Sequence, residues 1–172
     1  ATVDLDAPAG LPELVIEPAE RTPVWSLDLV NAPDVWLSLE FTGEGMVIGS
    51  MDTGVDLDHP ALVGKWRGGS NSWTDIVNGL TTPYDDHGHG THTIGTLVGG
   101  DGLGPFDPDI GVAPDARFIA AKILDENNAF SSASTVIAGA QWKLDPDGDP
   151  QTDDFPHVIN NSWYFYSHTY TG

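Results

Sequence analysis

Short apolar runs separated by Gly- and Asp-rich connections dominate the middle of the chain. Two of these runs, 45–51 and 116–124, predict buried strands, because each is a short apolar segment bounded by turn residues, and 157–161 predicts a third short strand. Two stretches between them predict helices, one over 93–98 and one that starts at Ser131 or Ser132 and continues to about Leu144. The alternation of strand and helix predicts an α/β fold with a mostly parallel sheet and helices on both faces.

The second predicted helix carries an apolar stripe at helical spacing, which we expect to pack on the sheet: Val136, Ile137, Ala140 and Leu144. The segment 24–39 is interrupted by Asn31-Ala32-Pro33 and predicts one or two short helices. Residues 1–22 are rich in Pro, Ala and Glu and predict an extended arm, followed by one unit over 23–172.

Composition excludes several classes of function. The 172 residues hold 26 acidic and 6 basic side chains, a net charge of −20. Such a surface repels phosphate backbones and anionic lipid, so we expect neither nucleic acid nor membrane as a partner. No apolar run approaches the roughly 20 residues of a membrane span. The absence of Cys excludes disulfides and thiolate chemistry.

Polar side chains with catalytic potential stand at the ends of the predicted strands: Asp52, the run from His87 to His92, and Ser162. Ligands of open α/β sheets bind at the carboxyl ends of the strands. A buried Asp52 is able to orient the imidazole of His89, so that the free ring nitrogen takes a proton from a hydroxyl nucleophile. The alternatives are a turn-forming Asp52 and a histidine run with one structural and two solvated members.

Four segments, in the same order along the chain, resemble those of the subtilisin-like serine proteases (subtilases): 47–60, 86–98, 111–124 and 158–163. Thr82-Pro-Tyr-Asp-Asp86 and Asn160-Asn-Ser-Trp163 are most similar to the bacillopeptidase F type. The resemblance implies a subtilisin-like fold in which Asp52 is the triad aspartate and His89 the general base. It also implies that residues 23–172 form the N-terminal part of a catalytic domain, and it suggests a secreted protein.

The nucleophile segment of the family, Gly-Thr-Ser-Met-Ala, does not occur in these 172 residues. The Asn that stabilises the oxyanion in the family would likewise follow Gly172. We therefore expect the fold to be incomplete without a C-terminal portion, and a C-terminal fragment of the same protease to supply both groups. The combined unit would be a serine endopeptidase acting on a peptide or protein substrate.

The resemblance also implies substrate-binding and calcium-binding residues. Extended substrate would lie between two segments whose members are Asn127, Asn128, Ala129, Phe130, Ser162, Trp163 and Tyr164. Core packing is an equal alternative for the aromatic run that starts at Trp163. Calcium ligands are expected at Asp107 and Asp109, where many subtilases bind calcium. The alternating Asp145, Asp147 and Asp149 suggest a second oxygen cage, although Pro150 excludes an EF-hand.

Two other functions compete with the protease. Because no catalytic serine is recognisable, the chain also fits an inactive protease-like domain used for binding. The spacing His87-x-His89-x-x-His92 resembles the zinc loop of metallo-β-lactamases and suggests a metallohydrolase, but that interpretation leaves the Asp52 segment unexplained.

Overall fold

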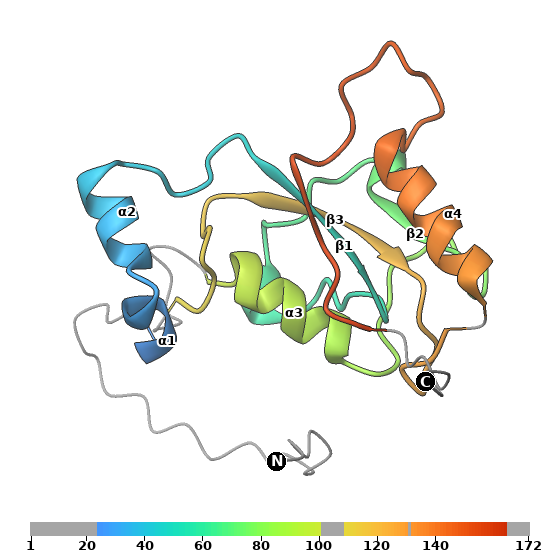
Figure 1. Ribbon diagram of the computed structural model, residues 1–172, viewed down its shortest axis with the longest axis horizontal. Coiled ribbons are helices and arrows are strands. Elements are labelled where there is room, and N and C mark those ends of the chain that lie inside the picture. Colours follow the sequence, from blue (N-terminus) through green and yellow to red (C-terminus); the bar gives the residue numbers. More distant parts are fainter. Residues whose placement is uncertain (1–23, 101–108, 131, 165–172) are drawn as a thin grey trace, which may run out of the picture.

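A parallel four-stranded sheet forms the centre of the computed structural model, which describes residues 24–100, 109–130 and 132–164 (Figure 1). The strands are β1 (Val47–Asp52), β2 (Trp73–Asp75), β3 (Arg117–Lys122) and β4 (Val158–Asn160), in the order β2-β3-β1-β4. All three pairings are parallel. The carboxyl ends of the strands therefore meet at one edge of the sheet, and β1, which ends at Asp52, lies between β3 and β4.

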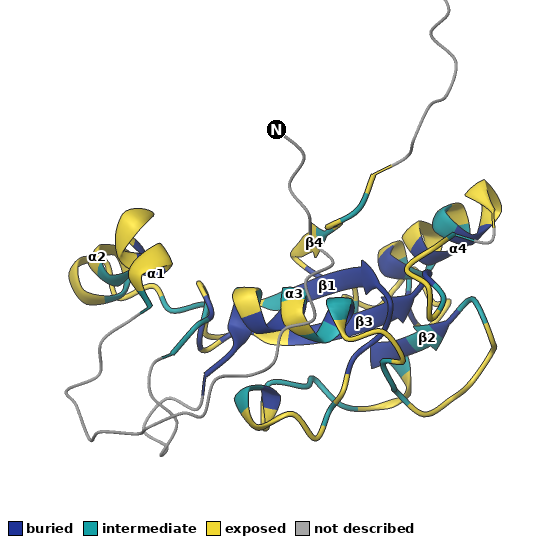
Figure 2. Cartoon of the chain, turned by 90° about the horizontal axis from the view of Figure 1, so that it is seen from below, coloured by how far each residue is buried: buried dark blue, intermediate teal, exposed yellow. Residues whose placement is uncertain are grey.

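Helices cover both faces of the sheet, as predicted. Side chains alternate between faces along a strand, and two separate apolar clusters result. Ile48 of β1 and Phe118 of β3 pack with α3 (His89–Val98) through its buried Ile94 and Val98. Met51 and Ala121 lie in the other cluster, against which Val136 and Trp142 of α4 (Ala133–Leu144) are packed. Figure 2 shows β1 and β3 as mostly buried and β4 as largely exposed.

The three strands predicted from the sequence are confirmed, and their observed bounds differ by one or two residues at most ends. The segment 24–39 forms two short helices, α1 (Trp25–Leu29) and α2 (Ala32–Ser38). Asn31 between them has a left-handed φ of 57°, and Pro33 stands at the start of α2. Helix α3 begins at His89, four residues before the predicted start. The structure also contains short 3-10 helices at Pro60–Leu62 and Ser70–Ser72.

The predicted apolar face of α4 is wrong in most of its members. Val136 is partly buried, but Ile137 and Leu144 are 58% and 71% exposed. The buried positions are instead Thr135, Gly139 and Lys143, which are four residues apart and so share one face. A side chain at Gly139 would collide with Ile123, so the glycine allows α4 to approach the sheet closely.

Lys143 completes the buried face of α4 although it is a cationic residue. It is fully buried, and its Nζ donates to the carbonyl oxygen of Ile119 at 3.0 Å. Burial, with a smaller contribution from the charge of Arg67, holds the pKa of Lys143 well below its usual range. The long aliphatic stem fills apolar space while the amine reaches a backbone acceptor.

Residues 1–23 lie outside the described residues, so the predicted N-terminal arm is not tested. None of the helices in the described ranges has the length and apolar character needed to cross a membrane.

Candidate active site

Asp52 and His89 are in direct contact at the carboxyl edge of the sheet. His89 Nδ1 lies 2.7 Å from Asp52 Oδ1 although the residues are 37 positions apart. Asp52 is 1% exposed, whereas the His89 side chain is 30% exposed. An ionised carboxylate only accepts hydrogen bonds, so Nδ1 carries the proton and Nε2 is left as the acceptor. A neutral imidazole held in this tautomer is able to act as a general base.

The Asp52 carboxylate has further donors that fix its orientation. Its Oδ1 accepts the backbone N–H of Thr53 at 2.7 Å, and its Oδ2 accepts the hydroxyl of Thr93 at 3.3 Å. Thr93 lies one turn after His89 on α3, so strand and helix both contribute to the site. These bonds satisfy a buried charge that would otherwise be costly to keep ionised.

Two glycines bring the start of α3 against the end of β1. A Cβ atom at Gly90 would collide with the backbone of Gly54, and Gly54 itself has a φ of +124°. Gly90 N–H donates to Thr53 Oγ1 at 2.8 Å, and this bond holds the start of α3 against the residues that follow β1. Gly88, the residue before the helix, has a φ of +93°. Gly90 thus places His89 next to Asp52 through a close backbone approach, and Gly88 supplies the left-handed conformation that precedes the helix.

Asp85 organises the loop that leads into α3. Its Oδ1 accepts from Thr53 Oγ1 and from the backbone of His87 and Gly88, and its Oδ2 accepts from both the backbone and the hydroxyl of Thr91. Burial would raise the pKa of Asp85, but the bonds from Thr91, Gly88 and Thr53 outweigh it and lower the pKa. The sequence analysis did not identify this role of Asp85. The one signal that could have indicated it is the position of an Asp shortly before the start of a helix.

Lys122 is a second residue whose role the sequence did not indicate. It stands at the end of β3, is fully buried, and its Nζ contacts Asp86 Oδ1 at 2.6 Å. The same nitrogen donates to the carbonyls of Thr53 at 2.6 Å and Leu124 at 2.9 Å. Lys122 therefore ties the ends of β1 and β3 to the loop that precedes His89. A lysine at the end of an apolar strand was the only available signal.

Comparison with known proteins decides the family. A sequence profile of the subtilase family, Peptidase S8, matches residues 43–167 and includes both Asp52 and His89. The chain belongs to the subtilase family. Among its relatives is bacillopeptidase F of Bacillus subtilis (strain 168), which is 39% identical over 152 residues, 81% of this chain. Subtilisin-like protease 1 of Arthroderma otae is 39% identical over 100 residues, or 58% of this chain, and subtilisin-like protease 1 of Trichophyton verrucosum is 32% identical over 129 residues, or 73%.

The chain spans only part of these subtilases. The aligned region is 10% of bacillopeptidase F, 18% of the Arthroderma protein and 29% of the Trichophyton protein. A solved structure, a cold-adapted subtilisin-like serine proteinase, is 29% identical with a TM-score of 0.49, and the match covers 59% of this chain and 33% of that one.

The first predicted substrate segment of this subtilase is a closed turn at the end of β3. Asp125 Oδ1 accepts the N–H groups of Asn127 and Ala129, and Asn128 has a left-handed φ of 59°. These backbone bonds lower the pKa of Asp125. Asn127, Asn128 and Ala129 are exposed, while Phe130 is half-buried. Substrate binding by these residues stays a prediction.

The second predicted substrate segment meets the first through two aromatic rings. The centroids of Phe130 and Trp163 are 5.0 Å apart in an edge-on arrangement, and Trp163 Nε1 donates to Met51 O at 2.8 Å. Trp163 thus packs against the core, which was the alternative interpretation for the start of this aromatic run. Ser162 is exposed and bonds to Asn160, and Tyr164 is 68% exposed. Both segments flank the end of β1, next to Asp52.

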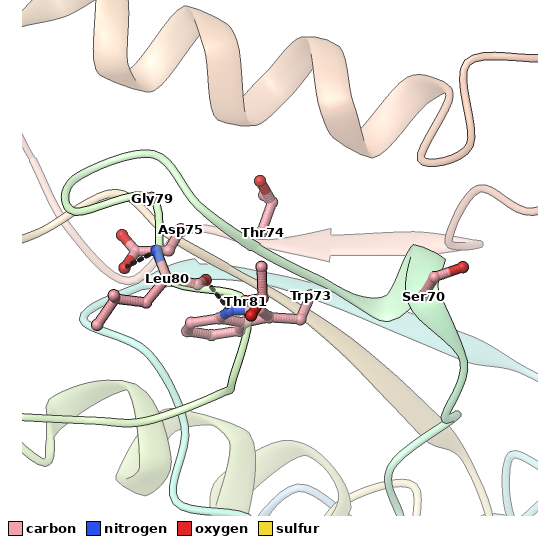
Figure 3. Close-up of a pocket in the computed structure, with 7 residues that line it drawn as sticks. All are labelled: Ser70, Trp73, Thr74, Asp75, Gly79, Leu80 and Thr81. Carbon is pink, nitrogen blue, oxygen red and sulfur yellow. Dashed lines mark hydrogen bonds between the residues drawn. The ribbon is translucent and has the colours of Figure 1, made fainter.

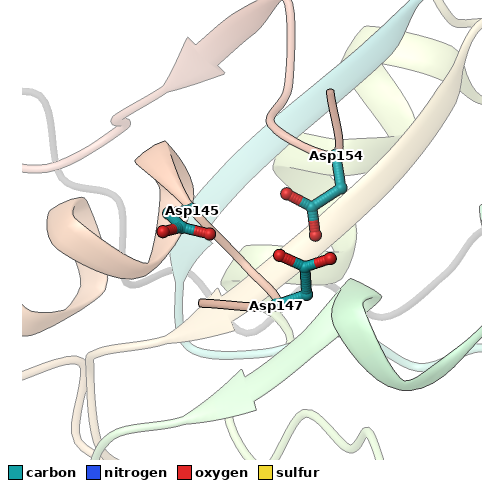
Figure 4. A group of neighbouring side chains, drawn as sticks. All are labelled: Asp145, Asp147 and Asp154. Atoms are coloured by element: carbon teal, nitrogen blue, oxygen red, sulfur yellow. The ribbon is translucent and has the colours of Figure 1, made fainter. Parts of the chain in front are cut away.

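Of the predicted calcium ligands, only some come together. Asp107 lies outside the described residues, and the side chain of Asp109 packs against Gly100. Asp145 and Asp147 are neighbours, but their third partner is Asp154 and not Asp149 (Figure 4). Asp149 is turned to its own loop, where its Oδ1 accepts the N–H of Gln151. The sequence did not indicate Asp154, because it stands nine residues after Asp145 and outside the alternating pattern.

The zinc interpretation of the histidine run finds no support in the geometry. Within residues 24–100, 109–130 and 132–164, the one group of three or more potential metal ligands is the aspartate cluster, and the histidines do not converge. The rings of His87 and His89 are 6.2 Å apart, and Nδ1 of His89 is bound to Asp52.

A hollow of about 450 Å³ lies beside β2, away from the Asp52–His89 pair (Figure 3). It is lined by Ser70, Trp73, Thr74, Asp75, Gly79, Leu80 and Thr81. Asp75 is buried in its wall and accepts backbone N–H groups of Val77, Asn78 and Leu80 as well as the Tyr84 hydroxyl. Since its acceptors are already used within the protein, this carboxylate shapes the wall of the hollow.

Proposed function

We propose that this chain supplies the aspartate and the histidine of an Asp-His-Ser triad, and that the assembled protein is a serine endopeptidase. The observation that carries the proposal is the 2.7 Å contact between a buried Asp52 and a partly exposed His89. The match to the subtilase family profile over both residues supports it. The serine and the oxyanion-stabilising Asn would come from polypeptide that follows these 172 residues, either continuous with them or cleaved from them.

In this proposal His89 Nε2 accepts the hydroxyl proton of the serine while the serine oxygen attacks the substrate carbonyl. Asp52 keeps the imidazole in the required tautomer and stabilises the imidazolium that forms. The imidazolium then donates its proton to the leaving amine, which breaks the peptide bond and leaves an acyl-enzyme. Water, deprotonated by the same nitrogen, releases the acid and restores the serine.

The substrate in this proposal is an extended peptide that lies between the two segments beside the end of β1. Asn127, Asn128 and Ala129 would flank it on one side, and Ser162 and Tyr164 on the other, all of which are exposed. Because the N–H groups of Asn127, Asn128 and Ala129 already bond to Asp125, this segment would offer an added strand only carbonyl oxygens as pairing groups. Phe130 and Trp163, which contact each other, would line an apolar subsite between the segments.

Secretion is a further part of the proposal. The acid-rich and lysine-poor composition is compatible with an exported protein, and membership of the subtilase family supports the proposal. Fractionation of a producing culture, with the protein found in the medium, is the expected result.

A fluorophosphonate reagent tests the triad in the full-length protein that contains this chain. Such reagents modify a serine only when a general base activates it. We expect one serine outside these 172 residues to be labelled, and His89→Ala to slow the labelling by several powers of ten. Subtilisin, a member of the same family, loses about 10⁶-fold in turnover when its triad histidine is removed.

His92→Ala is the matched control, because His92 is an exposed histidine three positions along the same helix. The reagent should label the serine of the His92→Ala variant at the same rate as that of the unmodified protein. Modification of Ser162 would contradict the assignment of the nucleophile. Complete absence of labelling in the folded full-length protein would instead favour the inactive binding domain.

A further inference from the structure

A buried lysine stands beside Asp52 on the neighbouring strand. In the parallel pairing of β1 with β3, Lys122 is the Cα partner of Asp52, and both side chains are almost completely shielded from solvent. The Nζ atom of Lys122 also lies 5.0 Å from the centre of the Tyr84 ring. A buried cation is costly unless its donors are bonded, so the acceptors around this nitrogen show what the charge holds in place.

The ammonium group of Lys122 has three acceptors, and each belongs to a different segment. Its Nζ lies 2.6 Å from Thr53 O, 2.6 Å from Asp86 Oδ1 and 2.9 Å from Leu124 O. Because an ammonium carries three N–H donors, these bonds use its whole capacity. A planar guanidinium directs its donors into one plane, so an arginine would not reproduce the arrangement.

Each of the three segments contributes a part of the proposed active site. Thr53 directly follows Asp52, the proposed triad acid. Asp86 stands three residues before His89, in the loop that enters α3. Leu124 follows the end of β3 and immediately precedes the turn 125–129, which contains most of the first predicted substrate segment. One nitrogen atom therefore joins the segments of the acid, of the base and of the substrate turn.

The substrate turn has a second link to the end of β1. The backbone N–H groups of Ile123 and Leu124 both donate to Asp52 O, at 2.9 and 3.3 Å. Backbone hydrogen bonds within the turn are the main cause that lowers the pKa of Asp125, and the charge of Lys122 contributes in the same direction. The turn is therefore fixed both to the strand that carries Asp52 and, through Leu124, to the lysine.

We propose that Lys122 is a positioning residue, which holds the substrate turn 125–129 at a fixed place relative to the Asp52–His89 pair. The inference rests on the proposed function and gives Lys122 no contact with the substrate. Without the ammonium, the loop before His89 and the substrate turn would each move independently. A misplacement of about 1 Å between reacting groups costs about 100-fold in rate. Both kcat and KM should therefore depend on this side chain.

Steady-state kinetics of the full-length protein with a peptide substrate, expressed per active site, tests the proposal. A fluorophosphonate reagent counts the active sites, so a variant that is only less stable has fewer sites but unchanged kcat and KM. Lys122→Met keeps a chain of similar length and removes the donors. It should lower kcat per site by about 10- to 100-fold and raise KM by about threefold or more.

Lys143→Met is the matched control. Lys143 is also fully buried, and its Nζ donates to the carbonyl oxygen of Ile119 in the middle of β3. The variant removes a buried ammonium from the same sheet, so it should lose stability but keep kcat and KM per site within about twofold of the unmodified protein. Equal constants per site in Lys122→Met and Lys143→Met would overturn the proposal, as would a change in Lys122→Met that is confined to kcat or to KM.

Asp86→Ala tests the same network in a variant that leaves the core filled, because the Asp86 side chain is 30% exposed. It releases only the loop before His89, so kcat per site should fall about tenfold while KM stays within about twofold. An unchanged kcat in this variant would contradict the role of Lys122. If the unmodified protein is neither labelled nor able to cleave the peptide, the proposed function itself fails, and this inference fails with it.

Discussion

Gly90 packs on the backbone of Gly54 so closely that no side chain fits between them. This contact joins the first turn of α3 to the residues that follow β1, and it sets the position of His89 relative to Asp52. The contact between Asp52 and His89 therefore depends on two residues that have no side chain.

Gly90→Ala should disrupt the site, whereas Gly95→Ala should not. The added methyl at Gly90 forces the helix away from Gly54, so we expect at least about 2 kcal/mol less unfolding free energy and a large loss of turnover. At Gly95, also in α3, the methyl would lie 3.5 Å from Ile110, an ordinary contact. Alanine there should raise the unfolding free energy by about 0.5–1 kcal/mol. Urea unfolding of both variants checks the difference, and equal stabilities would contradict the packing argument.

Asp52→Asn should leave the structure intact and remove the activity of the assembled enzyme. The amide no longer requires a proton on His89 Nδ1, so the imidazole loses its fixed tautomer and kcat should fall by about 10⁴-fold with little change in KM. Asp56→Asn is the control, because Asp56 is exposed and its carboxylate accepts the N–H of Asp58 within its own turn. Steady-state kinetics with a peptide substrate measures both variants. If the kcat of Asp52→Asn were comparable to that of Asp56→Asn, Asp52 would have no part in the mechanism.

Lys122→Met should destabilise the protein more than Asp86→Asn does. The lysine variant leaves the buried carbonyls of Thr53 and Leu124 without this donor, and Asp86 without its cation. We expect a loss of about 2–4 kcal/mol in unfolding free energy for Lys122→Met and about 1–2 kcal/mol for Asp86→Asn. The smaller value reflects that Asp86 is 30% exposed and that an asparagine oxygen still accepts from Lys122. Chemical denaturation gives both values, and the reverse order would be inconsistent with the network.

Asp85 should make stability depend on acid pH. Because its pKa is lower in the folded protein, its contribution is complete above the unfolded value of about 4 and is lost as the pH falls through the folded value. Asp85→Asn should cost about 1–3 kcal/mol at neutral pH through lost hydrogen bonds. The difference from the unmodified protein should then shrink below about pH 4.

Thermal unfolding across that pH range tests this prediction for Asp85. The exposed Asp58→Asn provides the control, and it should follow the unmodified protein at every pH. A constant difference between Asp85→Asn and the unmodified protein from about pH 7 to about pH 3 would show that Asp85 does not titrate in this way.

The sequence by itself determined the features that depend on residues close together in the chain. Apolar runs marked β1 and β3, because a buried parallel strand needs a continuous apolar segment. A shorter run marked β4, which lies at an edge of the sheet and is largely exposed. Ser132 marked the start of α4, where its side chain accepts the N–H of Thr135. Asp52 and the histidine run were recognisable as candidates because each follows or precedes such an element.

Contacts between distant segments were decided only by the tertiary structure. Strand β2 has only three residues and forms by pairing with the edge of β3, so no local sequence pattern predicts it. The buried face of α4 is set by a glycine and a lysine, since close approach and a backbone acceptor outweigh hydrophobicity there. Asp154 joins Asp145 and Asp147 because the chain returns toward β1, and Asp85 and Lys122 meet the site from separate segments. Local periodicity records which side chains prefer burial, but the charges and donors that meet across the fold depend on how the segments pack.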